Sequence, residues 1–122
     1  MQYLLLIYGQ EADWTNLTPA QHTTMQQEYG QFTRDISEKG KNLGSNRLQP
    51  VSTATTVRVR DGRRVVTDGP FAETKEQLGG YYLIDAKDLD EAIGIAARVP
   101  MARKGTVEIR PVVEIPGLPT VS

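Results

Sequence analysis

The fold of this chain is indicated first by a short apolar stretch near its start, residues 2–8, QYLLLIY. The stretch ends at Gly9 and shows no alternation of polar and apolar residues, which is typical of a β-strand covered on both faces. It is too short for a membrane span and has no basic leader, so it does not resemble a signal peptide. We therefore expect a buried strand, no contact with membranes and a cytoplasmic protein.

A long helix is predicted after this strand. Thr18 and Gln21 form a capping-box pattern, and Pro19 occupies the first helical position. The helix should run from about residue 19 to 39 and end at Gly40, because glycine is the usual left-handed residue after a helix. The side chains expected to face the core recur at steps of three and four: Met25, Tyr29, Phe32 and Ile36.

The clearest local signal is a β-hairpin in residues 55–67, TTVRVRDGRRVVT. Its central Asp-Gly pair favours a two-residue type I′ turn. Such a turn fixes the pairing of the two strands, so that Val57 lies opposite Val66 and Thr55 lies opposite Asp68. The carboxylate of Asp68 should therefore share a face with the two valines.

The remaining elements complete an α+β pattern. Strands are predicted near residues 42–48, 80–84 and 106–110, and Pro111 places the last one at a sheet edge or at a bulge. The order matches a ferredoxin-like βαββαβ unit with an extra hairpin strand, in one domain of residues 1–114, followed by a loose tail, 115–122. A second helix is predicted from residue 89 to about 99, with these side chains inward: Leu89, Ala92, Ile93 and Ala96.

The strands also predict an assembly. Two helices can cover only one face of this sheet, yet residues 2–8 and 80–84 are apolar on both faces. A second copy of the chain is the simplest cover for the other face, because a two-fold contact is the commonest geometry of oligomers. We expect a homodimer.

Composition narrows the kinds of ligand. With 14 basic and 15 acidic side chains the net charge is -1, which provides no general attraction for nucleic acid. Cysteine is absent, which excludes thiol catalysis and Cys-ligated metals, and the single His has no metal-ligand spacing around it. We predict no metal and no cofactor, and a small-molecule or protein partner fits better than nucleic acid.

Residues 68–82, DGPFAETKEQLGGYY, resemble the signature segment of the DGPF-motif proteins in the YCII-related family. The similarity extends to the opening YLLLIYG and to the closing EIRP of residues 108–111. The resemblance implies a dimeric α+β barrel, in which two ferredoxin-like sheets pack face to face. Some members of the family are thought to act on small molecules through a His-Asp pair, and DGPF proteins are often found beside extracytoplasmic-function sigma factors.

Two carboxylates are the first candidates for chemistry. Asp68 lies at the end of the hairpin on a face with valines, and burial there would suit it to proton transfer. The alternative is that its carboxylate accepts backbone hydrogen bonds and holds the Gly69-Pro70 turn. Glu73 is the second acid/base candidate, and its alternative role is that of a solvated charge.

Four further residues complete the predicted site. Lys75 and Arg47 are candidates for orienting an anion, and Tyr82 is a third candidate ligand-binding residue. His22 joins the inward side of the long helix and would act as a neutral base, or it would pack on Leu17 as a hydrophobic staple. The function predicted is binding or transformation of a small molecule by carboxylate acid/base chemistry. The alternative is a non-catalytic accessory or ligand sensor in sigma-factor regulation, and whether the protein is an enzyme stays open.

Overall fold

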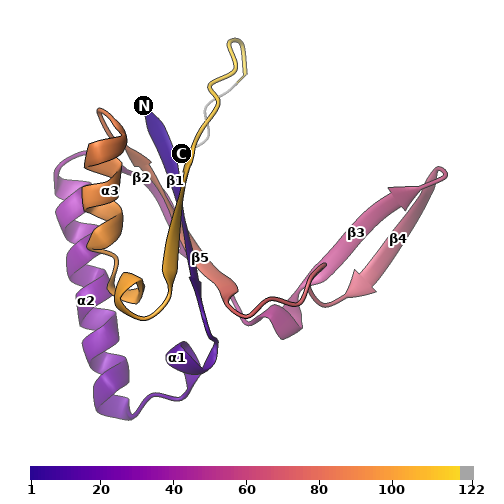
Figure 1. Cartoon of the computed structure of the whole chain (residues 1–122), viewed down its shortest axis with the longest axis horizontal. Coiled ribbons are helices and arrows are strands. Elements are labelled where there is room, and N and C mark those ends of the chain that lie inside the picture. Colours follow the sequence, from indigo (N-terminus) through magenta and orange to yellow (C-terminus); the bar gives the residue numbers. More distant parts are fainter. Residues whose placement is uncertain (119–122) are drawn as a thin grey trace.

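A four-stranded antiparallel sheet forms the body of the protein, and two helices pack on one of its faces (Figure 1). This computed structural model describes residues 1–118. The strand order β2-β5-β1-β6 is compatible with the ferredoxin-like arrangement, and the α+β class predicted from the sequence is confirmed. The elements are β1 (Gln2–Gly9), α2 (Pro19–Glu38), β2 (Asn42–Arg47), β5 (Gln77–Asp85), α3 (Leu89–Ala97) and β6 (Thr106–Pro111).

The central strand β1 separates two apolar faces. Tyr3, Leu5 and Ile7 are buried against the helices, whereas Leu4 and Leu6 on the other face are only half-buried. This alternation is the ordinary two-residue period of a strand, with apolar residues at both phases. The predicted two-sided strand is therefore confirmed, and its second face is left open in a single chain.

Helix α2 has the predicted start and core-facing side. The Thr18 side chain accepts from the Gln21 backbone N–H, and the Gln21 side chain accepts from the Thr18 backbone N–H, which completes the capping box. Phe32 and Ile36 are buried, and the earlier residues of the stripe are partly buried against the same core. The helix ends at Glu38, one residue before the predicted end.

Helix α3 corrects one prediction. Leu89 and Ile93 were expected to face inward, but they are 50% and 49% exposed. The residues that pack on the sheet are Ala92, Ile95 and Ala96. The buried stripe of α3 is therefore centred between Ala92 and Ile95, and Leu89 and Ile93 lie outside it. Apolar residues occur on both sides of this helix, and the way it packs on the sheet decides which of them are buried.

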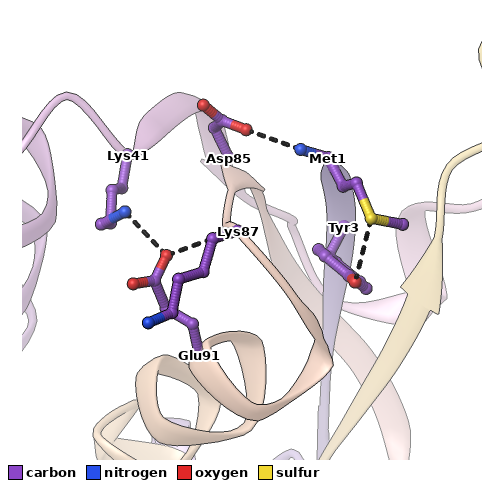
Figure 2. Close-up of polar contacts among 6 residues, drawn as sticks. All are labelled: Met1, Tyr3, Lys41, Asp85, Lys87 and Glu91. Atoms are coloured by element: carbon purple, nitrogen blue, oxygen red, sulfur yellow. Dashed lines mark hydrogen bonds and ion pairs between the residues drawn. The ribbon is translucent and has the colours of Figure 1, made fainter.

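Polar contacts tie the start of α3 to the sheet (Figure 2). The Lys41 ammonium donates to Glu91 at 2.7 Å, and the Lys87 backbone N–H donates to the same carboxylate at 3.0 Å. Both hydrogen bonds lower the pKa of Glu91, and the one from Lys41 has the larger effect. The N-terminal ammonium of Met1 lies 3.1 Å from the Asp85 carboxylate at the end of β5.

The hairpin forms with its predicted register but outside the main sheet. Strands β3 (Thr55–Arg60) and β4 (Arg63–Asp68) pair only with each other and extend away from the helices (Figure 1). Val57 lies opposite Val66, as predicted. Asp61 and Gly62 have positive φ angles of 52° and 73°, as a type I′ turn requires. The expected extra strand is thus a separate two-stranded sheet.

Three short elements link these parts: α1 (Ala12–Thr15) and the 3-10 turns Val51–Thr53 and Pro100–Arg103. β6 is an edge strand that ends at Pro111, as expected. Of the predicted tail, Ile115 and Leu118 are exposed and close a turn, and residues 119–122 lie outside the described part of the chain. No helix within residues 1–118 is both long and apolar enough to cross a membrane.

Candidate functional site

A cavity of about 350 Å³ lies between the first half of α2 and the helix-facing side of the sheet. Figure 1 shows α1, which contributes Trp14 to the wall, at the same end of the molecule as the start of α2. We call this space the α2 cavity. Its walls come from β1, from Trp14 of α1, from α2, from residues 45–47 of β2 and from residues 79–82 of β5.

Strand pairing directs two side chains of β2 into this cavity. Ser45 lies opposite Tyr82, and Arg47 lies opposite Gly80. Tyr82 and Gly80 belong to the buried, helix-facing side of β5. Because residues directly across a sheet point to the same side, Ser45 and Arg47 project toward α2. β2 is an edge strand, and Arg47 is exposed at its end.

Trp14 forms one wall, directly on a bulge in β5. The β1–β5 register shifts between Ile7 and Tyr8, which leaves Gly79 as the extra residue. A Cβ atom on Gly79 would lie 2.6 Å from Cη2 of the Trp14 ring, closer than any real contact. Only glycine therefore allows the indole to come this close to the strand.

Two tyrosines form the interior of the cavity. The Tyr82 hydroxyl shares a 2.7 Å hydrogen bond with Thr33, and its ring packs edge-on against Phe32 at 5.0 Å between centroids. Burial raises the pKa of Tyr82, and burial raises the pKa of Tyr29 to about 12. Both hydroxyls therefore keep their protons at neutral pH, and Tyr82 already has a partner for its own.

The charge of the cavity is positive. Arg47 forms no ion pair with any residue in the described part of the chain, although four such pairs occur elsewhere. The His22 ring lies on the same wall, with its Nε2 atom 3.2 Å from the amide nitrogen of Gln26. Within the described part of the chain, no acidic side chain lines the cavity. Across residues 1–118 no three His, Cys, Asp or Glu side chains are grouped closely enough to hold a metal ion.

The predicted site residues separate into two groups. His22, Arg47 and Tyr82 all line the α2 cavity. Asp68, Glu73 and Lys75 do not: they are exposed, and they lie on the hairpin end and on the segment that returns to β5. The α2 cavity therefore contains the helix and sheet candidates but not those of the segment after the hairpin. Leu17, the expected staple partner of His22, lines a different groove.

The surroundings of Asp68 also differ from those expected. Val57 and Val66, which share its face of the hairpin, are 57% and 56% exposed, so a single chain does not bury that face. The Gly69 backbone N–H donates to the Ala54 carbonyl at 2.7 Å. This donor is therefore not available to the Asp68 carboxylate, and main-chain bonding holds the start of the turn instead.

Sequence reasoning missed two residues that matter for the cavity, Trp14 and Ser45, and Trp14 gave the weaker signal. Trp14 lies in a short helix of four residues, which has no periodic pattern to place it. The usable signal was the Gly79-Gly80 pair, because glycines inside a strand often mark a bulge or a close approach by another group. That pair predicts a contact on β5 but not which residue makes it.

Comparison with known proteins places the chain in a family. A family model described as the YCII-related domain matches residues 1–116. An uncharacterised protein of Rhizobium meliloti (strain 1021) is 38% identical over 113 residues, which cover 91% of each chain. Both matches span nearly the whole sequence, hairpin and α2 cavity included. The protein therefore belongs to the YCII-related family.

Proposed function

We propose that this protein binds a small molecule in the α2 cavity. The observation that carries the proposal is a cavity of about 350 Å³ whose wall presents an arginine without an acidic partner in the described chain. Ligand pockets are commonly of this size, with apolar walls and a few polar groups that orient the ligand. Trp14 and Met25 supply the apolar part here, and Ser45 and Arg47 supply the polar part.

The cavity favours binding over carboxylate catalysis within one chain. A general acid or base must come within hydrogen-bonding reach of its substrate. Asp68 and Glu73 lie outside the α2 cavity, so their proposed acid/base role requires a second copy to supply them. His22 is the one candidate base that a single chain provides. A ligand sensor without turnover is accordingly the second candidate function, favoured by the absence of carboxylates from the wall.

The proposed assembly is a homodimer through the open face of the sheet. Leu4 pairs with Leu83, and Leu6 pairs with Tyr81, so the half-buried centre of this face is apolar. On the edge strand β6 the partners of the same residues are Arg110 and Glu108. An apolar centre with a polar rim is the usual composition of a protein interface.

A thermal-shift screen against a metabolite library tests the binding proposal. A ligand that binds only the folded chain, at about 100 times its Kd, stabilises it by about 2.7 kcal/mol and raises the Tm. Ser45→Phe should fill the α2 cavity and abolish the shift. Ser52→Phe is the matched control, because Ser52 is exposed in the turn before β3. Binding in the α2 cavity is contradicted if no compound shifts the Tm, or if Ser45→Phe keeps the full shift.

Light scattering tests the assembly. The wild-type chain should have about twice its mass of 13.5 kDa. Leu6→Asp should give a monomer, because it places a charge at the centre of the open face. Val113→Asp is the control, since Val113 is 80% exposed and lies beyond β6. A folded wild-type monomer at micromolar concentration would contradict the dimer without bearing on the α2 cavity.

A further inference from the structure

We infer that the ligand of the α2 cavity is a small planar carboxylate, an aromatic monoanion whose carboxylate pairs with Arg47 while its ring packs on Trp14. The inference rests on the proposed function, since it names the chemical class of the molecule that the cavity binds. Charge, the shape of the wall and the state of the neutral donors each support it.

Charge selects an anion. Among the described residues, 1–118, Arg47 is the only side chain of fixed charge on the cavity wall, and it projects from β2 toward α2. The chain as a whole has a net charge of -1, so the positive wall is a local feature and not a general one. A guanidinium presents paired N–H donors that match the two oxygens of a carboxylate.

The wall is unsuited to a phosphate. Helix N-termini commonly bind phosphates through free backbone N–H groups. At the start of α2 the Gln21 N–H is already used by the Thr18 side chain, and the Thr18 N–H by the Gln21 side chain. Arg47 would face a phosphate dianion with no second cation of fixed charge on the wall. One arginine matches one carboxylate instead.

The shape of the cavity wall favours a ligand with a flat ring. The Trp14 indole lies on Gly79, and Ile7 and Met25 line the same space, so the ligand meets apolar surfaces. A planar ring packs on an indole with little loss of its own conformational freedom, since it has few rotatable bonds. The cavity volume corresponds to roughly ten water molecules at about 30 Å³ each. This space suits a ligand of one or two rings.

Neutral donors complete the wall. Tyr29 lines the cavity with a hydroxyl that is uncharged at neutral pH, as that of an ordinary tyrosine is, and burial raises its pKa further, to about 12, so it does not repel an anion. Ser45 adds a second hydroxyl from β2. The wall formed by the described residues carries no acidic side chain, so a carboxylate meets no like charge from them.

Isothermal titration calorimetry with trans-cinnamate as the ligand tests the inference. Cinnamamide has the same ring without the charge, and 3-cyclohexylpropionate has the charge without the planar ring. Cinnamate should bind, and the two analogues should bind at least about tenfold more weakly. Trp14 is the only tryptophan of the chain, so cinnamate should also change its fluorescence.

Matched variants locate the carboxylate. Arg47→Met keeps an apolar stem and should weaken cinnamate binding by about ten- to a hundredfold, to the level of cinnamamide. Arg58→Met is the control, because Arg58 is exposed on the hairpin outside the cavity, and it should bind like the wild type. Equal binding of cinnamate and cinnamamide, or no effect of Arg47→Met, overturns the inference.

The two proposals fail in different ways. If the metabolite screen yields only neutral or cationic ligands, and Ser45→Phe abolishes their binding, the α2 cavity binds ligands but the carboxylate class is wrong. If the screen yields nothing and cinnamate gives no heat and no change in Trp14 fluorescence, the proposed function fails together with the inference.

Discussion

Replacing Gly79 with alanine tests the wall of the α2 cavity directly. The added Cβ would lie 2.6 Å from Cη2 and 2.7 Å from Cζ2 of Trp14. Carbon atoms in favourable contact are about 3.5–4.0 Å apart, so the indole and the strand must separate by about 1 Å. The ring cannot bend, and a Cβ on Gly9 would already be only 3.1 Å from the same ring atom, so little free space surrounds it.

The expected cost follows from this overpacking. An extra methyl group in a well-packed site costs about 1–3 kcal/mol. Alanine also restricts the unfolded chain, which offsets about 0.4–1 kcal/mol of that cost. We therefore expect Gly79→Ala to lower the free energy of unfolding by on the order of 1–2 kcal/mol and to shift the emission of Trp14 toward that of an exposed indole.

Urea unfolding measures the stability, and the fluorescence of the folded state reports on Trp14. Gly94→Ala is the matched control, because a Cβ at Gly94 meets nothing within 4 Å and the residue lies inside α3. Alanine there should raise the free energy of unfolding by about 0.5–1 kcal/mol. If Gly79→Ala is as stable as the wild type and its emission is unchanged, the indole does not lie on Gly79 and the reasoning is refuted.

Gly62→Val should destabilise the hairpin by about 1 kcal/mol or more, because Gly62 has a φ of 73° that valine resists. Hydrogen exchange of the hairpin amides measures the loss. Unchanged protection of these amides would exclude a type I′ turn. Asp68→Asn should change the free energy of unfolding by no more than about 0.5 kcal/mol, because Asp68 is exposed, and a larger loss on thermal unfolding would indicate a structural role. Because folding lowers the pKa of Glu91, its carboxylate contributes stability at pH values above its ordinary pKa of 4.5. This contribution is lost as the pH falls through the lowered pKa. Glu91→Gln should therefore lose less stability than the wild type on acidification, and parallel pH profiles would contradict the role of Lys41.

Local chemistry made several elements predictable. The capping box at Thr18 satisfies backbone groups that are free at any helix start, so it predicts the start of α2 without tertiary contacts. The Asp61-Gly62 turn fixes the hairpin register in the same way, because both residues adopt positive φ. The apolar run of β1 predicts a strand with two apolar faces. Each of these depends on residues close together in the sequence.

Tertiary packing decided the rest. The hairpin residues predict their own pairing, but not that β3 and β4 stand apart from the main sheet, because that depends on where the chain leaves β2. The inward side of α3 was predicted only in part, since Ala92 and Ala96 are buried as expected but docking on the sheet buries Ile95 in place of Leu89 and Ile93.

The same distinction between local sequence and tertiary packing applies to the candidate site. From the sequence alone, residues 2–8 predicted a strand covered on both faces, and the Asp61-Gly62 pair predicted the hairpin. His22 and Arg47 were named as candidates without any means of placing them together. Only the antiparallel register of β2 and β5 points Arg47 toward α2. Only the bulge at Gly79 admits Trp14 to the same cavity. Turns and caps are local and can be inferred from sequence, whereas a cavity exists only where separate elements pack imperfectly against one another.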